Sequence, residues 1–248
     1  MSTTNFIRAP ARAPGSCPCC GSRGGTVFTP VMWRALGDEW GLSDEEYAYI
    51  DRQQGESCVD CNANLRSQAL ALAILRTQES RDTFRNFTGT VRGRLLRILE
   101  INHAGDLRYF FRRRSRHELR FYPELDMMNM SAIASGTYDL VVHSDTLEHV
   151  PDPVRALEEC RRVLRPGGAC CFTVPIVVGR LTRSRQGLPP SYHGGESDKF
   201  ADHLVHTEYG ADIWRQVLEA GFAECRIVAV QPPAAHAVVG LKARDDRE

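Results

Sequence analysis

The chain has 248 residues, of which 31 are basic and 31 acidic, so its formal net charge at neutral pH is zero. This balance excludes a global field that would attract nucleic acid or an anionic membrane surface. Apolar residues make up 42% of the chain and charged residues 25%, as in ordinary globular proteins, and the length suits one α/β domain with a small appendage.

No apolar run approaches the roughly 20 residues of a membrane span. The first residues, Met-Ser-Thr-Thr-Asn, lack the apolar core of a signal peptide. We therefore expect a cytoplasmic protein with no membrane partner, in which thiols stay reduced and clustered cysteines indicate metal binding. Residues 1–16 are mostly Ala, Pro, Arg and Thr, and we expect a mobile arm there.

Two Cys-x-x-Cys pairs follow, and their members are Cys17, Cys20, Cys58 and Cys61. Two such pairs supply four thiolates in tetrahedral ligation, which is typical of a closed structural zinc site. The sequence therefore predicts a zinc-ribbon-like module that binds Zn²⁺. Free thiols or a redox pair are the alternatives, and Cys19 is a candidate substitute ligand.

The 37 residues between Cys20 and Cys58 exceed the roughly 15 to 20 of common zinc ribbons. A short β-like run covers residues 26–29. The Ser43-Asp-Glu-Glu46 stretch is a capping box that predicts a helix to about residue 53, which would fill the insertion. Apolar residues from Leu65 onward follow a helical period, so we expect a helix over 64–77 that links the module to the rest of the chain.

From Leu95 onward the chain alternates between strand and helix patterns. Between Tyr138 and Val174 the order is strand, turn, helix, Gly turn and strand, which is a βαβ unit and implies a parallel sheet with a right-handed crossover. The last two strands are expected to form an antiparallel pair at the sheet edge, after a long irregular segment over 176–207. We predict strands over 95–101, 119–122, 138–142, 169–174, 222–230 and 235–241, and helices over 106–114, 154–164 and 208–220.

Three stretches of this region stand in a recognisable order: Asp139-Leu-Val, then Asp145-Thr-Leu-Glu-His-Val-Pro-Asp-Pro153, then Arg162-Val-Leu-Arg-Pro-Gly-Gly168. In this order and spacing, over residues 95–222, the chain resembles the class I S-adenosylmethionine (SAM)-dependent methyltransferases with a Leu-Glu-His-Val element after the fourth strand. The resemblance implies a Rossmann-like α/β fold, with a mainly parallel doubly wound sheet, and SAM as methyl donor.

The resemblance places SAM at the turn after the first strand, Glu100-Ile-Asn-His-Ala-Gly105. Glu100 matches the family's acidic position. Gly105, with the small Ala104 and with Asn102, which tolerates a positive φ, stands where the family has glycines. Because only one glycine remains, an ordinary turn in a degenerate domain is the alternative.

Further cofactor contacts are implied by position. Asp126, followed by Met127, stands where the family has an Asp that contacts the adenine amino group. The family's ribose-binding acid has two candidates, Glu118 and Glu124, which could equally be solvated charges. His143 and Asp145 follow the fourth strand, whose carboxyl end lies at the edge of a parallel sheet where ligands bind.

The segment from Leu188 to Gly195 resembles the acceptor-site segment of small-molecule and sugar-type members. Within it His193 is the candidate general base and Tyr192 a positioning group, with a flexible loop as the alternative. Asp145 and His149 lie where the methionine end of the cofactor and the acceptor meet in related enzymes, although His149 could equally be a helix-entry residue. Three nearby arginines, at 180, 183 and 185, could hold an anionic acceptor or form a solvated basic loop.

We therefore expect an N-terminal arm and zinc-ribbon-like module over 1–64, a linking helix and connector over 65–94, and a methyltransferase domain over 95–248. The expected reaction is methyl transfer from SAM to a small polar acceptor, such as a sugar or natural-product hydroxyl. The run after residue 143 lacks the Pro-Pro-aromatic motif of enzymes that methylate exocyclic base amines, which argues against that reaction.

Two alternatives differ in class. An RNA methyltransferase could use the zinc module to grip RNA, which the run from Arg112 to Arg116 favours, whereas zero net charge and the lack of an aromatic-basic strip oppose it. A non-catalytic scaffold with a SAM-binding fold is suggested by the loss of turn glycines. The sequence leaves the acceptor and the oligomeric state open.

Overall fold

The structure is a computed structural model that describes residues 15–111, 116–193 and 201–245. Most of the predicted N-terminal arm, the arginines of the 112–115 run and the glycines at 194 and 195 therefore lie outside the described residues.

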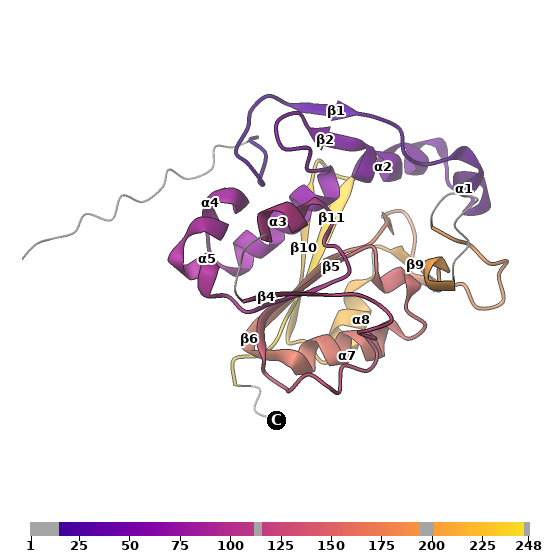
Figure 1. The fold of residues 1–248 in the computed structure, drawn as a ribbon. Coiled ribbons are helices and arrows are strands. Elements are labelled where there is room, and N and C mark those ends of the chain that lie inside the picture. The colour runs from indigo at the N-terminus through magenta and orange to yellow at the C-terminus, as the bar shows by residue number, and fades with distance from the viewer. Residues whose placement is uncertain (1–14, 112–115, 194–200, 246–248) are drawn as a thin grey trace, which may run out of the picture.

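A mixed sheet forms the centre of the described chain, with the strand order β10-β11-β6-β5-β3-β4 (Figure 1). The four strands β4, β3, β5 and β6 run parallel, and β11 runs antiparallel to both of its neighbours, β6 and β10. This confirms the predicted α/β class, the parallel βαβ unit and the closing antiparallel pair. The strands are β3 (Ile98–Ile101), β4 (His117–Arg120), β5 (Tyr138–Ser144), β6 (Leu164–Thr173), β10 (Glu224–Val230) and β11 (Ala235–Leu241).

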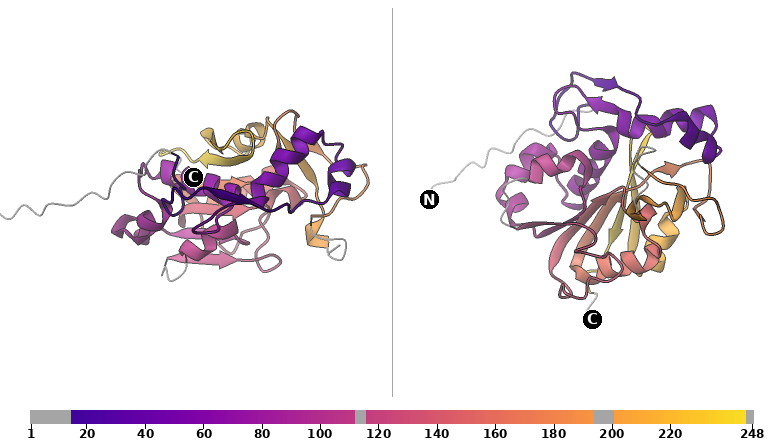
Figure 2. Two further views of the ribbon diagram at one scale, coloured as in Figure 1. Left: turned by 90° about the horizontal axis from the view of Figure 1, so that it is seen from above. Right: turned by 45° about the vertical axis from the view of Figure 1, so that its right-hand side comes forward.

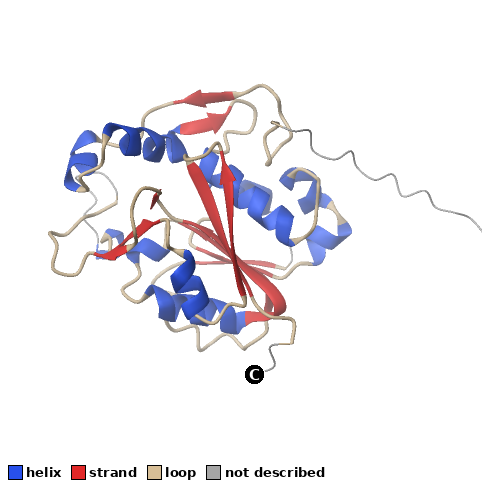
Figure 3. Ribbon diagram, turned by 180° about the vertical axis from the view of Figure 1, so that it is seen from behind, coloured by secondary structure: helices blue, strands red, loops and turns tan. Residues whose placement is uncertain are grey.

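Helices cover both faces of this sheet, as Figure 1 and the view from behind in Figure 3 show. Side chains alternate along each strand, so Leu140 and Val142 of β5 join the apolar layer under α3 while Val141 joins the layer under α7. The core is therefore two apolar layers. On the first side lie α3 (Leu65–Thr77), α4 (Phe84–Gly89), α5 (Val91–Leu95) and α6 (Arg108–Phe111), and on the second lie α7 (Pro153–Val163) and α8 (Trp214–Glu219).

Local capping signals fix where several helices begin. The Ser43 hydroxyl accepts a hydrogen bond from the Glu46 amide, and the Glu46 carboxylate accepts one from the Ser43 amide, which is the capping box that the sequence predicts. Asn64 caps α3, and Asp152 caps α7 with proline in its first turn. These residues satisfy amides that would otherwise have no partner at a helix start.

The N-terminal module consists of a two-stranded antiparallel pair and two helices, and it lies beyond one end of the central sheet (Figure 2). The helix α3 follows it and packs on β6, β10 and β11, so the predicted linking helix is also part of the sheet's helical layer. The limits at residues 64 and 94 stay a prediction. The elements of the module are β1 (Thr26–Phe28), α1 (Arg34–Glu39), α2 (Asp44–Gly55) and β2 (Glu56–Cys58).

The segment after β6 is more ordered than its composition predicts. Three short strands form a second sheet in the order β7-β9-β8. Residues 208–210, where we expected a helix to begin, lie in its central strand, which spans residues 207–210. The prediction was wrong there because Glu208 is buried and pairs with both Arg183 and Arg185. The elements are β7 (Ile176–Val177), β8 (Arg183–Ser184), η3 (Ala201–His203) and β9 (Thr207–Gly210).

Other element boundaries differ from the sequence prediction as well; the strand predicted over 169–174, for example, is β6 and begins at Leu164. Leu95 ends α5 instead of opening a strand, because Thr90 caps that short helix and accepts a hydrogen bond from the Gly93 amide. The strand predicted over 119–122 is β4, which ends at Arg120. Among the described residues, no helix has the length and apolarity needed to cross a bilayer.

Candidate functional site

A cavity of about 720 Å³ opens at the carboxyl edge of the parallel strands. Asn102 follows β3 and lines it on one side, and Asp145 and Thr146 follow β5 and line it on another. The N-terminal module supplies the facing wall through apolar and aromatic side chains, namely Val31, Met32, Trp33, Leu36, Trp40, Leu42 and Ile50.

The turn after β3 is held from within by Glu100. Its carboxylate is fully buried, accepts a hydrogen bond from the Ala104 amide at 2.8 Å, and lies 2.6 Å from His117 Nε2. Asn102 adopts a φ of +54°, the conformation that a glycine would otherwise supply, and its side chain lines the cavity. Glu100 and Ala104 thus shape the turn without lining the cavity, so the predicted direct contacts of these two residues with the cofactor need correction.

The residue that requires a glycine at position 105 is Ser67 of α3, and not the cofactor that the sequence suggested. The φ of Gly105 is +55°, and a Cβ added there would lie 2.6 Å from Ser67 Oγ on α3. Gly105 does not line the cavity. Its small size is therefore required by the packing of α3 against the turn, and the predicted cofactor contact is corrected.

The predicted adenine end of the site lies after β4. Asp126 and Met127 line the cavity beside Leu125, and Asp126 Oδ1 accepts a hydrogen bond from the Met128 amide at 2.8 Å. The two ribose candidates are exposed and do not line the cavity: Glu118, which pairs with Arg120, and Glu124. Phe121 and Tyr122 line the cavity at that position instead.

Arg66 of α3 is a cavity residue that sequence analysis missed. Its side chain is 4% exposed and contacts the carboxylate of Asp145, which has a φ of +48° and also accepts a hydrogen bond from Gln54 Nε2 at 3.3 Å. Burial lowers the pKa of Arg66 to about 10, so it stays charged at neutral pH. Its Nε has no hydrogen-bond partner among the described residues. The available signal was a cation inside a helix otherwise rich in Ala and Leu.

His143 lies in the core and not in the cavity. It is fully buried, and its ring stacks on Phe172 with 4.8 Å between centroids. Burial lowers its pKa to about 4. The prediction that His143 contacts the cofactor is therefore wrong. Its side chain is packed in the protein core beside Phe172 and does not reach the cavity at the carboxyl edge of the sheet.

Two histidines gather at the other end of the cavity. His149 and His193 both line it, with their rings 5.0 Å apart, and the His193 ring lies 5.3 Å from that of Trp40. Burial lowers the pKa of His149. Tyr192 does not line the cavity and instead forms a backbone bridge with Leu204, so the predicted positioning role is not supported by its placement.

Beneath these histidines lies Glu148, which sequence analysis did not single out. Its carboxylate is 1% exposed, and Oε1 lies 3.6 Å from His193 Nδ1 and 3.9 Å from His149 Nε2. The signal for it was present in the Glu-His pair of the Leu-Glu-His-Val element. The contact between Glu148 and His193, which lie 45 positions apart in the chain, could not be read from the sequence. It depends on how the segment after β6 packs against the end of β5.

The three arginines after β6 have partners of their own. Arg180 bonds to Glu46 of the N-terminal module, and Arg183 and Arg185 bond to Glu208. None of the three lines the cavity. Each is therefore paired within the protein, and the structure gives no support to the suggestion that they hold an anionic acceptor in this cavity.

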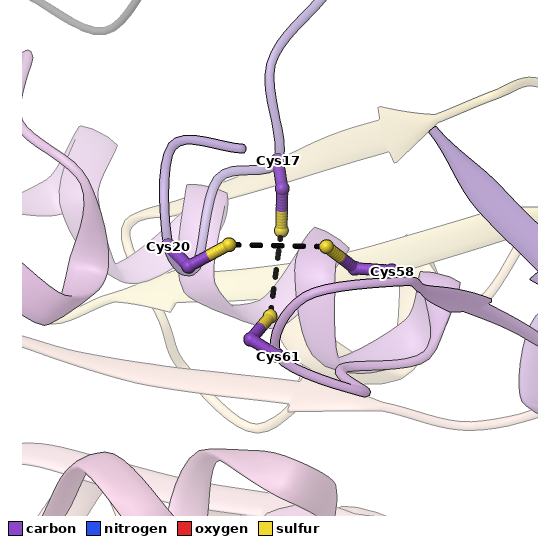
Figure 4. Close-up of side chains that lie close together, drawn as sticks. All are labelled: Cys17, Cys20, Cys58 and Cys61. Carbon is purple, nitrogen blue, oxygen red and sulfur yellow. Dashed lines mark hydrogen bonds between the residues drawn. The ribbon is translucent and has the colours of Figure 1, made fainter. Parts of the chain in front are cut away.

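The four cysteines of the two Cys-x-x-Cys pairs converge, as Figure 4 shows. The Sγ atoms of Cys17 and Cys61 lie 3.8 Å apart, and so do those of Cys20 and Cys58. Four thiolates at a metal–sulfur distance of about 2.3 Å in a tetrahedron are separated by about 3.8 Å. The donor set and its spacing therefore fit a tetrahedral ion. Cys19 is excluded as a substitute ligand, because its thiol faces the Ser67 carbonyl at 3.8 Å.

Comparison with known proteins found a family model and several curated relatives that match parts of the chain. Residues 89–172 match the family model described as "Methyltransferase domain". The chain is 30% identical over 158 residues to an uncharacterised 37.1 kDa protein in a transposon of Streptomyces fradiae, a match that covers 61% of this chain and 45% of that protein. It is 37% identical over 115 residues to the ubiquinone biosynthesis O-methyltransferase of Psychrobacter arcticus, covering 44% and 42%.

Among solved structures, a SAM-dependent methyltransferase from Thermotoga maritima is 15% identical, with a TM-score of 0.39 over 59% of this chain and 82% of that one. This chain spans less than half the length of the two curated relatives.

Proposed function

We propose that this chain, whose residues 89–172 form a methyltransferase domain, transfers the methyl group of SAM to a hydroxyl of a small polar acceptor such as a sugar or a natural product. One observation carries the proposal. A single cavity joins the predicted cofactor contacts Asn102 and Asp126 to the histidine pair His149 and His193. Bound SAM would supply an electrophilic methyl group between these two ends.

The cofactor end offers chemistry that suits SAM. Arg66 is a buried cation with an unpartnered Nε, which suits the carboxylate of the methionine part. Asp126 suits the adenine amino group, and Leu125 and Met127 provide apolar contact for the ring. The volume of about 720 Å³ lies within the range of roughly 300–1,000 Å³ for cofactor sites, with room left for a small acceptor.

Asp145 has a supporting part in this arrangement. It pairs with Arg66 and accepts from Gln54, so it orients the buried guanidinium and ties α3 and α2 to the end of β5. We therefore assign Asp145 a positioning role in place of the catalytic role that the sequence suggested.

The acceptor end must orient a hydroxyl and remove its proton as the new bond to oxygen forms. His149 Nδ1 lies 3.0 Å from the Leu204 carbonyl, which can only accept, so Nε2 is left as the acceptor nitrogen. His193 lies beside it, with its ring 5.3 Å from that of the buried Trp40, which holds the imidazole at this end of the cavity. The relatives named for ubiquinone O-methylation support oxygen as the attacked atom.

The four-cysteine cluster would hold a structural Zn²⁺. The ion would fix the N-terminal module, and with it the aromatic wall of the acceptor site.

The proposal is tested first by calorimetry with SAM and S-adenosylhomocysteine, and then by turnover on hydroxylated acceptors. His193→Ala and His149→Ala should each lower turnover by about 10² to 10⁴ with SAM affinity nearly unchanged, because these residues act on the acceptor. His236→Ala, on β11 outside the cavity, is the matched control and should turn over normally.

Four outcomes would contradict the proposal or part of it. Folded protein that binds no SAM at millimolar concentration is not a methyltransferase. Binding without turnover on any hydroxyl, amine or RNA acceptor would identify a scaffold, and salt-dependent binding and methylation of RNA would favour the RNA enzyme. If both histidine variants turn over normally, the acceptor needs no base.

A further inference from the structure

We propose that Glu148, His149 and His193 form a binding site for one divalent transition-metal ion at the acceptor end of the cavity. One carboxylate oxygen and two imidazole nitrogens lie within 4.8 Å of one another there. This site is separate from the four-cysteine cluster. Its meaning for catalysis rests on the proposed function: with the ion bound, the lone pairs of His149 and His193 would ligate it, and the ion would lower the pKa of a bound acceptor hydroxyl in place of a general base. The binding of the ion can be measured by itself.

The first argument is the state of the Glu148 carboxylate. It is 1% exposed, and neither oxygen has a hydrogen-bond partner among the described residues. A buried carboxylate without a partner is costly by several kcal/mol, so buried charges are paired or ligate metals. Its neighbours His149 and His193 compensate this charge only when they are protonated, and the nearby guanidinium of Arg66 is paired with Asp145. With both imidazoles neutral, the position therefore calls for a cation.

The second argument is the spacing of the three ligand atoms. Glu148 Oε1 lies 3.6 Å from His193 Nδ1 and 3.9 Å from His149 Nε2, beyond hydrogen-bond distance. Ligands at about 2.1 Å from a tetrahedral ion are separated by about 3.4 Å. The two separations from Glu148 therefore need to shorten by a few tenths of an ångström around an ion, and the two histidine nitrogens, which lie within 4.8 Å of each other, must also approach.

The third argument is the tautomer of His149. Its Nδ1 lies 3.0 Å from the Leu204 carbonyl, which has no proton to donate, so Nδ1 carries the proton. The lone pair on Nε2 is then free on the side that faces Glu148. A metal-ligating histidine characteristically donates its other ring N–H to a carbonyl or carboxylate, which fixes the ring and raises its basicity.

The setting indicates which ion and which ligand the site would take. Imidazole and carboxylate without thiolate suit Zn²⁺, Co²⁺, Fe²⁺ or Mn²⁺. Two of the three ligands, His149 and His193, line the cavity, and Glu148 is buried behind them. The remaining coordination positions would therefore face the acceptor space, as in open catalytic sites. An ion there would favour acceptors that present a hydroxyl next to a second oxygen donor.

The test uses the full chain loaded with one equivalent of zinc, which the four thiolates take first, so that the second site is left free for titration with Co²⁺ by calorimetry and absorbance. Wild type should bind one Co²⁺ per chain with the spectrum of nitrogen and oxygen ligation instead of thiolate ligation. Glu148→Gln and His193→Asn should each weaken this binding at least tenfold. His193 is partly exposed, so His193→Asn should keep its fold, which an unchanged zinc content would show. His236→Asn, outside the cavity, should bind like wild type.

Two results would overturn the inference: zinc-loaded wild type that binds no Co²⁺, or Co²⁺ binding that neither variant weakens. A protonated histidine would then be the partner of Glu148. Failure here with intact SAM binding leaves the methyltransferase proposal standing. Co²⁺ binding at this site without SAM binding would retain the metal site and remove the methyltransferase.

Discussion

Arg180, which follows β7, forms a bidentate ion pair with Glu46 of α2: Nη2 lies 2.7 Å from Oε2 and Nε lies 3.1 Å from Oε1. The same guanidinium donates to the carbonyls of Trp40 and Gly41 at 2.7 and 2.6 Å. Because Trp40 lines the cavity, this contact joins the cysteine-bearing module to the acceptor wall. The module is thus part of the site and not an independent appendage.

Arg180→Ala should lower the free energy of unfolding by about 1–3 kcal/mol, because it leaves a half-buried carboxylate and two carbonyls without their donor. Arg180→Lys should recover only part of this, since an ammonium cannot reproduce the planar fork. Urea unfolding measures both. Arg215→Ala, which removes a 68% exposed partner of Asp212, is the control and should stay within about 0.5 kcal/mol of wild type. Equal losses in Arg180→Ala and the control would show that the fork contributes nothing.

The purified protein should contain about one zinc ion per chain. Cys58→Ser should remove it and destabilise the module, because ligation supplies folding free energy to a small unit. Cys19→Ser is the matched control within the same knuckle and should retain the ion, since that thiol faces Ser67. Metal analysis of reduced protein reads out both variants, and zinc-free wild type would end the prediction.

Arg66→Gln should weaken SAM binding about 10- to 100-fold, because a charged hydrogen bond is worth about 1.5–3 kcal/mol. Arg76→Gln provides the control, as Arg76 lies on the same helix but is exposed. Calorimetry compares the two. Equal affinities would place the carboxylate of SAM away from α3.

Gly105→Ala should destabilise the fold more than Gly187→Ala. Both glycines have positive φ, but an added Cβ at Gly187 meets nothing within 4 Å, whereas at Gly105 it meets Ser67 Oγ at 2.6 Å. Each substitution should show a backbone cost of about 1 kcal/mol, and Gly105→Ala a further loss from overpacking of about 1–3 kcal/mol. Chemical denaturation gives the difference, and equal losses would mean that α3 shifts freely.

Stability should fall below about pH 6.5 because of His143. Burial lowers the pKa of His143 in the folded protein to about 4. Between pH 6.5 and 4 the imidazole is therefore protonated in the unfolded chain but still neutral in the folded chain. Stability is therefore full above this window and is lost as the pH falls through it. By pH 5 the loss from this group is roughly 2 kcal/mol. His143→Gln should lose that much less stability than wild type between pH 7.5 and 5 in urea titrations; identical pH dependence would contradict the assignment.

Much of the fold follows from local patterns. The βαβ unit from Tyr138 to Thr173, the capping box at Ser43 and the cap at Asn64 were predictable, because periodicity and capping depend on residues within a few positions of one another. The positive φ of Asn102 was predictable in the same way, because asparagine tolerates this conformation in a tight turn. The two Cys-x-x-Cys pairs could likewise be identified from the spacing of their cysteines alone.

The tertiary structure alone decided which of these residues share a surface. Glu208 became a strand residue because two arginines bury its charge, and His143 was drawn into the core by the direction of one side chain on β5. Arg66 meets Asp145, and Glu148 meets His193, across separations that no local pattern records. Such contacts depend on how the N-terminal module and the segment after β6 pack over the sheet edge, which is set by the sum of many weak contacts made by the whole chain.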